Sequence, residues 1–256
     1  MKKVLIALTL VLALSSMALA AETKMSGKVW FNVDDLLAKT LTTSNGYRLQ
    51  FDSTVSEKSG ARIRFENDTT TGAPVALKRA YWFTNTEFGK LLVGKQVEDF
   101  SMLSNNYAAE NLNHGFTGVA LYPQLGENIS AIGWYDIAGK KVGAQGKYTA
   151  DFGVIYGGIS KAEADTDAAM AIGASIPVVK DQLTVFGQYD MKGDTREQFV
   201  GAKANLGVDL TAEYKIQAKE ISLNATKKLG DVELSATYTK PDAGDGSLEL
   251  ASTVYF

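Results

Sequence analysis

Apolar and polar residues alternate along much of the chain with a period of two. Tyr47, Leu49 and Phe51 fall on one side of an extended chain. Arg48 and Gln50 fall on the other side. Side chains of a β-strand point alternately to its two faces, so this segment is predicted to be a strand with one apolar and one polar face. The same alternation occurs in the segments 28–34, 61–66 and 247–256.

Polar connections separate the predicted strands, and short connections alternate with mostly longer ones. The short ones are 56–60, 86–90, 123–127, 149–152, 178–182, 206–209 and 229–231. The longer ones are 34–46, 67–77, 97–114, 136–141, 161–168, 191–197, 215–219 and 240–246. In an antiparallel sheet this order places the short connections at one rim and the long ones at the other. The pattern predicts an all-β chain of about 16 strands, with 12 to 14 as the alternative counts.

The alternation alone does not say which solvent meets the apolar face. A soluble barrel buries its apolar face inside, whereas a membrane barrel turns that face to lipid and its charges to a water-filled lumen. Two features favour the membrane. Aromatic residues lie near many strand ends, as at a membrane interface. A single sheet of this many strands also encloses more space than its side chains can fill. The sequence therefore predicts a transmembrane antiparallel up-and-down β-barrel.

The first twenty residues have the features of a secretory signal peptide. Lys2 and Lys3 precede the apolar run 4–14, and Ala18 and Ala20 form a small-residue cleavage site. Residues 1–20 are therefore predicted to be removed, and residues 21–256 to form the barrel. The run is shorter than the ~20 apolar residues that a spanning helix needs.

Composition and motifs exclude several classes of function. Removing residues 1–20 removes two lysines and no acid, so the net charge changes from −3 to −5, and an acidic chain without a basic stripe does not suit nucleic acid. There is no cysteine, and His114 is the only histidine. It has no recognisable nucleophile motif beside it, and no phosphate loop, dinucleotide fingerprint or metal motif is present. We therefore expect no enzyme activity, no cofactor and no metal.

Four segments resemble the general porins of the Gram-negative outer membrane. The final TVYF is similar to the closing strand of that family, SGKVWFNV to its first strand and YRLQF to its second. EFGKLLVGKQ resembles the stretch that leads into the third loop, with Lys95 where the family commonly has arginine. The chain departs from the family by being shorter and by lacking an acidic Pro-Glu-Phe-Gly-Gly stretch in that loop.

The resemblance implies a homotrimeric diffusion channel in outer-membrane lipid, whose terminal Phe256 is the signal read by the barrel-assembly machinery. It also implies that the third loop, residues 97–114, folds into the lumen. Acids of this loop would then face bases of the wall across a constriction, and the field between them would sort ions by sign. The candidate constriction residues are Lys28, Arg48, Arg62, Arg64, Lys95, Glu98, Asp99 and Glu110.

The predicted function is a passive channel for ions and small hydrophilic solutes. The alternatives are a structural or adhesive barrel, a barrel enzyme, a soluble periplasmic β protein, and a sugar-specific channel, for which Trp30 is the only indication. The pattern leaves open which face carries Arg79, Trp82 and Trp134.

Overall fold

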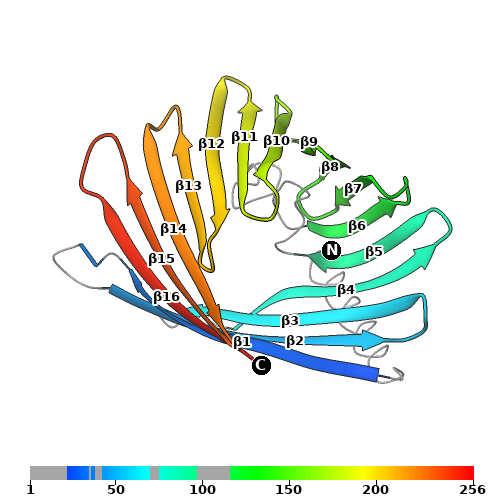
Figure 1. The fold of residues 1–256 in the computed structure, drawn as a ribbon. Helices are drawn as coiled ribbons and strands as arrows, with labels where there is room; N and C mark the ends of the chain where they lie inside the picture. The colour runs from blue at the N-terminus through cyan, green and yellow to red at the C-terminus, as the bar shows by residue number, and fades with distance from the viewer. Residues whose placement is uncertain (1–21, 35, 38–41, 70–74, 97–115) are drawn as a thin grey trace.

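The structure is a computed structural model that describes residues 22–34, 36–37, 42–69, 75–96 and 116–256. These residues form sixteen β-strands (Figure 1). The strands are β1 (Glu22–Asp34), β2 (Thr42–Thr54), β3 (Ser59–Thr69), β4 (Ala76–Thr86), β5 (Gly89–Gln96), β6 (Phe116–Pro123), β7 (Ile129–Asp136), β8 (Lys141–Ala150), β9 (Gly153–Ala162), β10 (Ala169–Val179), β11 (Leu183–Lys192), β12 (Thr195–Asn205), β13 (Asp209–Lys215), β14 (Glu220–Leu229), β15 (Val232–Lys240) and β16 (Ser247–Tyr255). The predicted signal peptide lies outside the described residues.

Each strand pairs with its neighbours in the sequence, and the sheet closes into a barrel where β1 pairs with β16 (Figure 1). All the pairings are antiparallel, as in β1 and β2, where Lys28 lies opposite Arg48. At the closing seam Lys28 lies opposite Tyr255 and Val33 opposite Leu250. The closed sheet leaves no edge strand whose backbone groups would otherwise be unpaired. The predicted antiparallel sixteen-stranded barrel is confirmed, and no helix among the described residues is long and apolar enough to cross a membrane.

The connections fall at two rims. One rim, here the turn rim, carries the short connections and the start of β1. These connections are 55–58, 87–88, 124–128, 151–152, 180–182, 206–208 and 230–231. The other rim, here the loop rim, carries the described connections 137–140, 163–168, 193–194, 216–219 and 241–246. Residues 97–115, in which the inward-folded third loop was predicted, lie outside the described residues.

One predicted long loop is a tight turn instead. The sequence pattern predicted a loop over 191–197, but β11 continues to Lys192 and β12 begins at Thr195. Gly193 has a φ of 57°, a conformation that suits the first position of a two-residue turn and that glycine adopts without steric cost. The polar residues around this turn were mistaken for a loop because they are inner-face or rim positions of the strands.

Ion pairs link neighbouring connections at the loop rim. Lys140 contacts Glu163 at 2.8 Å, which joins the connections 137–140 and 163–168. Lys219 contacts Asp242 at 3.3 Å and joins two further connections in the same way. Such exposed pairs each stabilise the fold by about 0–1 kcal/mol, so they order the rim more than they hold the barrel together.

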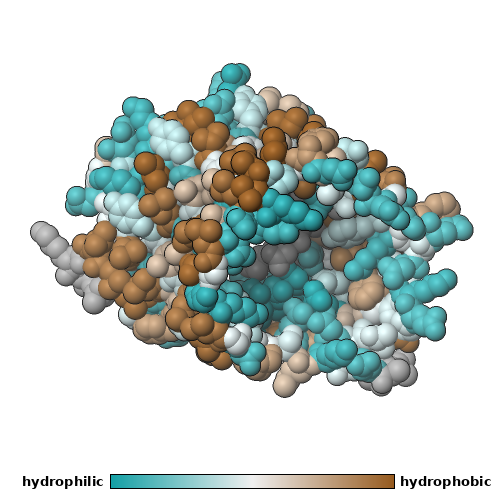
Figure 2. Space-filling model, in the orientation of Figure 1, coloured by the Kyte–Doolittle hydropathy of each residue, from teal (hydrophilic) through white to brown (hydrophobic). Residues whose placement is uncertain are grey.

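The two faces of the sheet differ in polarity. Large apolar side chains are exposed on the outer face, such as Val142 at 53%, Ile172 at 60% and Leu223 at 46% of their area. Figure 2 shows hydrophilic residues around the hollow of the barrel and hydrophobic residues gathered on its side. In water so much exposed apolar surface would cause aggregation, whereas lipid is its natural solvent.

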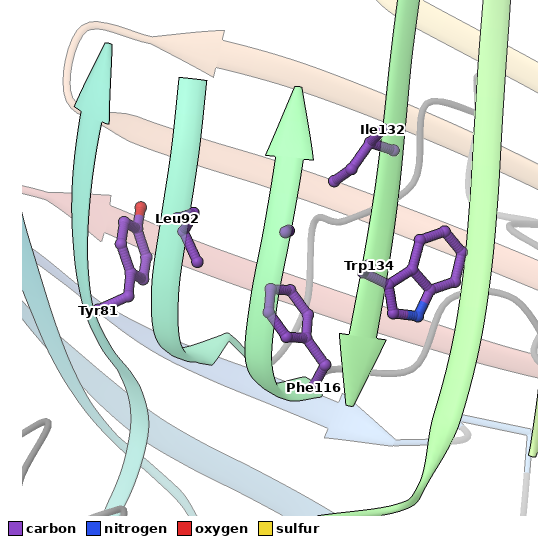
Figure 3. Packing of buried hydrophobic residues seen from close by; sticks show 6 residues of the cluster. Tyr81, Leu92, Phe116, Ile132 and Trp134 are labelled. Atoms are coloured by element: carbon purple, nitrogen blue, oxygen red, sulfur yellow. The ribbon is translucent and has the colours of Figure 1, made fainter. Parts of the chain in front are cut away.

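The inner face of β4–β7 is an exception, because it carries apolar side chains. Its cluster consists of Tyr81, Leu92, Phe116, Ala120, Ile132 and Trp134 (Figure 3). These residues share one face by register, since Leu92 lies opposite Ala120 and Ala120 lies opposite Trp134. Phe83 and Tyr122 pack against the cluster. The polar lumen is therefore interrupted by an apolar wall at the strands that flank residues 97–115.

Candidate functional site

Strands β1, β2 and β3 place basic side chains on the inner face of the barrel. Lys28 lies opposite Arg48, and Arg48 lies opposite Glu66 on the next strand. Arg62 and Arg64 follow on the same face of β3, because side chains two residues apart in a strand share a face. The structure thus brings four of the predicted constriction residues onto one part of the lumen wall.

The arginines of this wall are paired with acids and an amide on the neighbouring strand. Arg48 Nε donates to Glu66 Oε2 at 2.7 Å, and Arg62 Nε donates to Asp52 Oδ1 at 2.5 Å. The side chain of Gln50 connects Arg64 to Asp52. Its oxygen accepts from Arg64 Nε at 3.0 Å, and its nitrogen donates to Asp52 Oδ2 at 2.7 Å. Charge-assisted bonds of this kind hold flexible side chains in one geometry along the wall.

Asp52 and Glu66 belong to the site, and the sequence analysis did not include them. The register of the hairpin formed by β2 and β3 could have identified both acids. With its turn at 55–58, the antiparallel register sets Asp52 opposite Arg62 and Glu66 opposite Arg48. Residues directly opposite each other on one face have Cβ atoms about 4.5–5.5 Å apart, so these ion pairs follow from the register.

Arg79 extends the basic wall onto β4. It lies opposite Arg64 on the inner face, and both side chains are buried. The register between β3 and β4 shifts at Arg64 and Phe65, so a β-bulge lies beside this pair. The neighbouring Trp82 lies opposite Ala61 on the outer face, whereas Trp134 of β7 lies on the inner face. The structure thereby assigns the three residues whose faces the sequence left open.

Lys28 also contacts an aromatic ring on the inner face. Its ammonium lies over the ring of Trp30, with Nζ 5.1 Å from the ring centroid. A cation over an indole face is attracted by the ring quadrupole, by about 0.5–1 kcal/mol at an exposed site. Trp30 therefore positions a charge at the wall.

Lys95 does not join this group. It lies opposite Ala80 on β4 and Thr117 on β6. Residues three positions apart in a strand point to opposite faces. Leu92 and Phe83 form an inner-face pair three positions from Lys95 and Ala80, so Lys95 and Ala80 are on the outer face. The other predicted members, Glu98, Asp99 and Glu110, lie outside the described residues. The structure thus groups Lys28, Arg48, Arg62 and Arg64 and sets Lys95 apart.

Acids lie on the opposite wall of the lumen. β3 and β11 are eight positions apart in the sixteen-strand ring, so they face each other across the barrel. On β11, Gln188 Nε2 donates to the two carboxylate oxygens of Asp190 at 2.8 and 3.0 Å. Asp190 lies opposite Glu197 of β12 on the same face. The sequence analysis missed this acidic pair because strand topology, and not sequence distance, sets it across from the arginines.

Among the described residues, no group of three or more His, Cys, Asp or Glu side chains could hold a metal ion. What the geometry offers is a polar passage with a cluster of arginines on one wall and, across the ring, a wall that carries Asp190 and Glu197 together with Lys192 and Lys203.

No family model matches the chain, and no curated protein matches it. Solved structures do. A triple mutant of Rhodopseudomonas blastica porin is similar with a TM-score of 0.75 and 13% identity, over 92% of this chain and 100% of that chain. Two other variants of Rh. blastica porin are similar over the same shares, with TM-scores of 0.76 and 13% identity. At this identity the likeness establishes the fold: the chain is a closed sixteen-stranded antiparallel barrel of the porin type.

Proposed function

We propose that the chain is a passive outer-membrane channel for ions and small hydrophilic solutes, and not an enzyme. The observation that carries this proposal is the inverted polarity of a closed barrel. Apolar side chains such as Ile172 are exposed on the outer face, while charged side chains such as Arg48 lie on the inner face. A sixteen-stranded ring is wide enough to leave an aqueous passage when its interior is polar.

The charged walls supply the selectivity of the channel. Arg48, Arg62 and Arg64 on one wall face the acids Asp190 and Glu197 on the other. Each of the two walls also holds charges of the opposite sign. The electric field at any point in the lumen is therefore the sum of opposing contributions from nearby bases and acids. An ion passing near the arginines meets a net positive wall, because these bases outnumber Asp52 and Glu66, the acids that pair with them.

The third loop completes a constriction in this proposal. Residues 97–115 connect β5 to β6, and the inner faces of those strands carry the apolar side chains of Leu92, Phe116 and Ala120. An apolar inner wall gives a loop folded into the lumen a surface on which to pack. Glu98, Asp99 and Glu110 would then be presented towards the basic wall. Lys95 has no part in this constriction, because its position is on the outer face.

The partners follow from the same function. The outer face is suited to outer-membrane lipid, and the turn-rim end of β16 would be the segment that the barrel-assembly machinery reads through Phe256. A homotrimer is the oligomeric state that we propose. Export with removal of residues 1–20 would bring the chain to this membrane.

Single-channel recording in a planar bilayer tests the proposal directly. Purified protein that migrates differently on a gel before and after boiling, as folded barrels do, should produce discrete conductance steps. A folded barrel of this kind that inserts and yet conducts no ions would favour a structural role instead. A chain that stays in the soluble periplasmic extract without detergent would exclude the membrane altogether.

A further inference from the structure

Aromatic side chains on the inner face lie directly opposite glycines. Within the part of the chain that the structure describes, one such pair, Tyr81 with Gly94, joins β4 and β5, which are connected at the turn rim, and five pairs join strands that are connected at the loop rim. The five loop-rim pairs are Trp30 with Gly46, Phe83 with Gly60, Trp134 with Gly143, Tyr156 with Gly173, and Phe186 with Gly201.

In each of the five loop-rim pairs the ring covers the glycine. A Cβ atom built on Gly173 would lie 2.5 Å from Cε2 of Tyr156, and one built on Gly201 would lie 2.5 Å from Cζ of Phe186. The ring of Trp134 is closer still to the corresponding position on Gly143. In Figure 3 the indole of Trp134 extends from β7 towards the next strand. The rings therefore lie along the wall, in the space that a side chain at the glycine would occupy.

We propose that these glycine–aromatic pairs set the bore of the channel. A bulky inward side chain narrows a lumen if it points to the barrel axis, and narrows it little if it lies flat on the wall. The missing Cβ of the glycine is what permits the flat position. This inference rests on the proposed channel function and adds the residues that determine its size limit for solutes.

Three of the rings also carry a lysine. Nζ of Lys28 lies 5.1 Å from the Trp30 centroid, that of Lys90 4.3 Å from Phe83, and that of Lys203 6.0 Å from Phe186. A ring that is lifted from the wall would displace its lysine as well. In these pairs the bore and the position of a positive charge are therefore coupled, so the other two loop-rim pairs give the simpler test.

Gly143 and Gly173 are the sites at which a methyl group acts on the ring alone. The three nearest atoms to a Cβ at either position all belong to the facing ring, of Trp134 or of Tyr156. Carbon atoms in favourable contact are about 3.5–4.0 Å apart, so each ring must withdraw by about 1 Å or more. A Cβ on this face points from the wall towards the interior, so we infer that the ring moves inwards together with the side chains that bury it, since only 6% of Trp134 and 2% of Tyr156 is exposed. At Gly201, by contrast, the carbonyl oxygen of Ala212 also lies 2.5 Å from such a Cβ, and the strand itself would be strained.

The experiment compares Gly143→Ala and Gly173→Ala with Gly146→Ala. Gly146 is on the same strand as Gly143 but on the outer face, and the nearest atom to a Cβ there is the oxygen of Ser130 at 3.8 Å. Single-channel conductance should fall in Gly143→Ala and Gly173→Ala and fall further in the double variant. The largest neutral polymer that enters the pore should become smaller in the same order. Gly146→Ala should conduct as the unchanged protein does.

A second substitution tests whether the displaced ring causes the fall in conductance. In the Gly143→Ala background, Trp134→Ala should restore the conductance. Trp134→Ala alone should raise conductance only slightly, because a ring on the wall blocks little of the lumen. A large increase in that single variant would mean that the ring projects into the pore, and it would overturn the proposal even if no glycine variant folds. Unchanged conductance in folded Gly143→Ala and Gly173→Ala would overturn it as well, whereas absence of any channel in the unchanged protein would refute the proposed function instead.

Discussion

Gly27 and Phe256 exchange two backbone hydrogen bonds across the seam of the barrel. The N–H of Gly27 donates to the carbonyl of Phe256 at 2.8 Å, and the N–H of Phe256 donates to the carbonyl of Gly27 at 3.0 Å. The aromatic ring of Phe256 also lies over Gly27, since a Cβ built there would be 2.6 Å from Cε2 of the ring. The last pair of the seam is thus closed by both backbone and side chain.

This contact leads to a prediction about assembly. Replacing Phe256 by serine keeps the backbone bonds but removes the ring, so we expect a lower yield of barrel in the outer membrane. Tyr238→Ser is the matched control, because Tyr238 is another outer-face aromatic, opposite Leu248. The measurement is the amount of heat-modifiable protein in isolated outer membranes. Equal yields for the two variants would argue against a special role for Phe256.

The placement of Arg48 and Lys95 on different faces predicts different effects of the same charge reversal. An ion about 8 Å from a wall charge feels roughly 0.5 kcal/mol in bulk water and about 2 kcal/mol at an effective dielectric constant of 20. Arg48→Glu should therefore shift relative permeability towards cations several-fold, and the reversal potential under a salt gradient measures it. Lys95→Glu should leave the reversal potential nearly unchanged.

Salt supplies the control for this prediction. At 1 M ionic strength the Debye length is about 3 Å, so the effect of Arg48→Glu should shrink. If Lys95→Glu shifts the reversal potential as much as Arg48→Glu does, the assignment of Lys95 to the outer face is incorrect.

Neighbouring residues on β14 test which face meets lipid. Leu223 is exposed on the outer face, and Asn224 points into the lumen, where Nδ2 donates to Thr237 Oγ1 at 2.8 Å. Arginine on the lipid face near the membrane midplane costs about 2–4 kcal/mol. Leu223→Arg should therefore lower the free energy of unfolding in lipid vesicles by that amount. Asn224 Oδ1 also accepts from Thr226 Oγ1 at 3.0 Å, so Asn224→Arg loses two hydrogen bonds and should cost about 1–2 kcal/mol. The reverse order would mean that the barrel is inverted.

A carboxyl group at the loop rim provides a test that depends on pH. Asp165 accepts a hydrogen bond from Lys192, with a separation of 3.0 Å, and this contact holds the pKa of Asp165 below its usual value of 3.8. Because the pKa is lowered in the folded state, the contact is fully present at neutral pH and is lost as the pH falls through the lowered value. Lys192→Gln should return the pKa to its usual range, and NMR titration of the barrel in micelles would detect the change. A pKa that stays low in Lys192→Gln would show that another group is responsible.

The alternation of residues was sufficient to predict most of the fold. It sets which residues share a face within each strand, and so it groups Lys28 with Trp30 on β1, Arg48 with Gln50 on β2, and Arg62 with Arg64 on β3. In a strand that lacks clear alternation, the sequence does not by itself show the phase, that is, which residues point into the barrel and which point outwards. In β5 the apolar residues Leu91, Leu92 and Val93 are consecutive, so either phase fits the sequence.

The structure assigns Lys95 to the outer face because the registers of β4 and β6 determine the phase of β5. The inner face of β5 carries the apolar Leu92 between Lys90 and Gln96, so polarity alone does not identify the lumen side of this strand. The sequence pattern also did not show which strands face each other across the barrel. Asp190 and Glu197 lie across from the arginines only because the ring closes with sixteen strands.

The closed seam between β1 and β16 is hydrogen-bonded like the other interfaces of the ring, so the barrel has no geometrically privileged starting strand. We therefore expect a circularly permuted chain to form the same barrel. If Phe256 were joined to Glu22 by a linker long enough to run back along β1 from Gly27, new ends could be opened in the connection 230–231 at the same rim. Such a chain keeps every strand pairing, but Phe256 becomes an internal residue. It would therefore separate the geometric role of Phe256 in closing the ring from any role of an aromatic residue at the end of the chain.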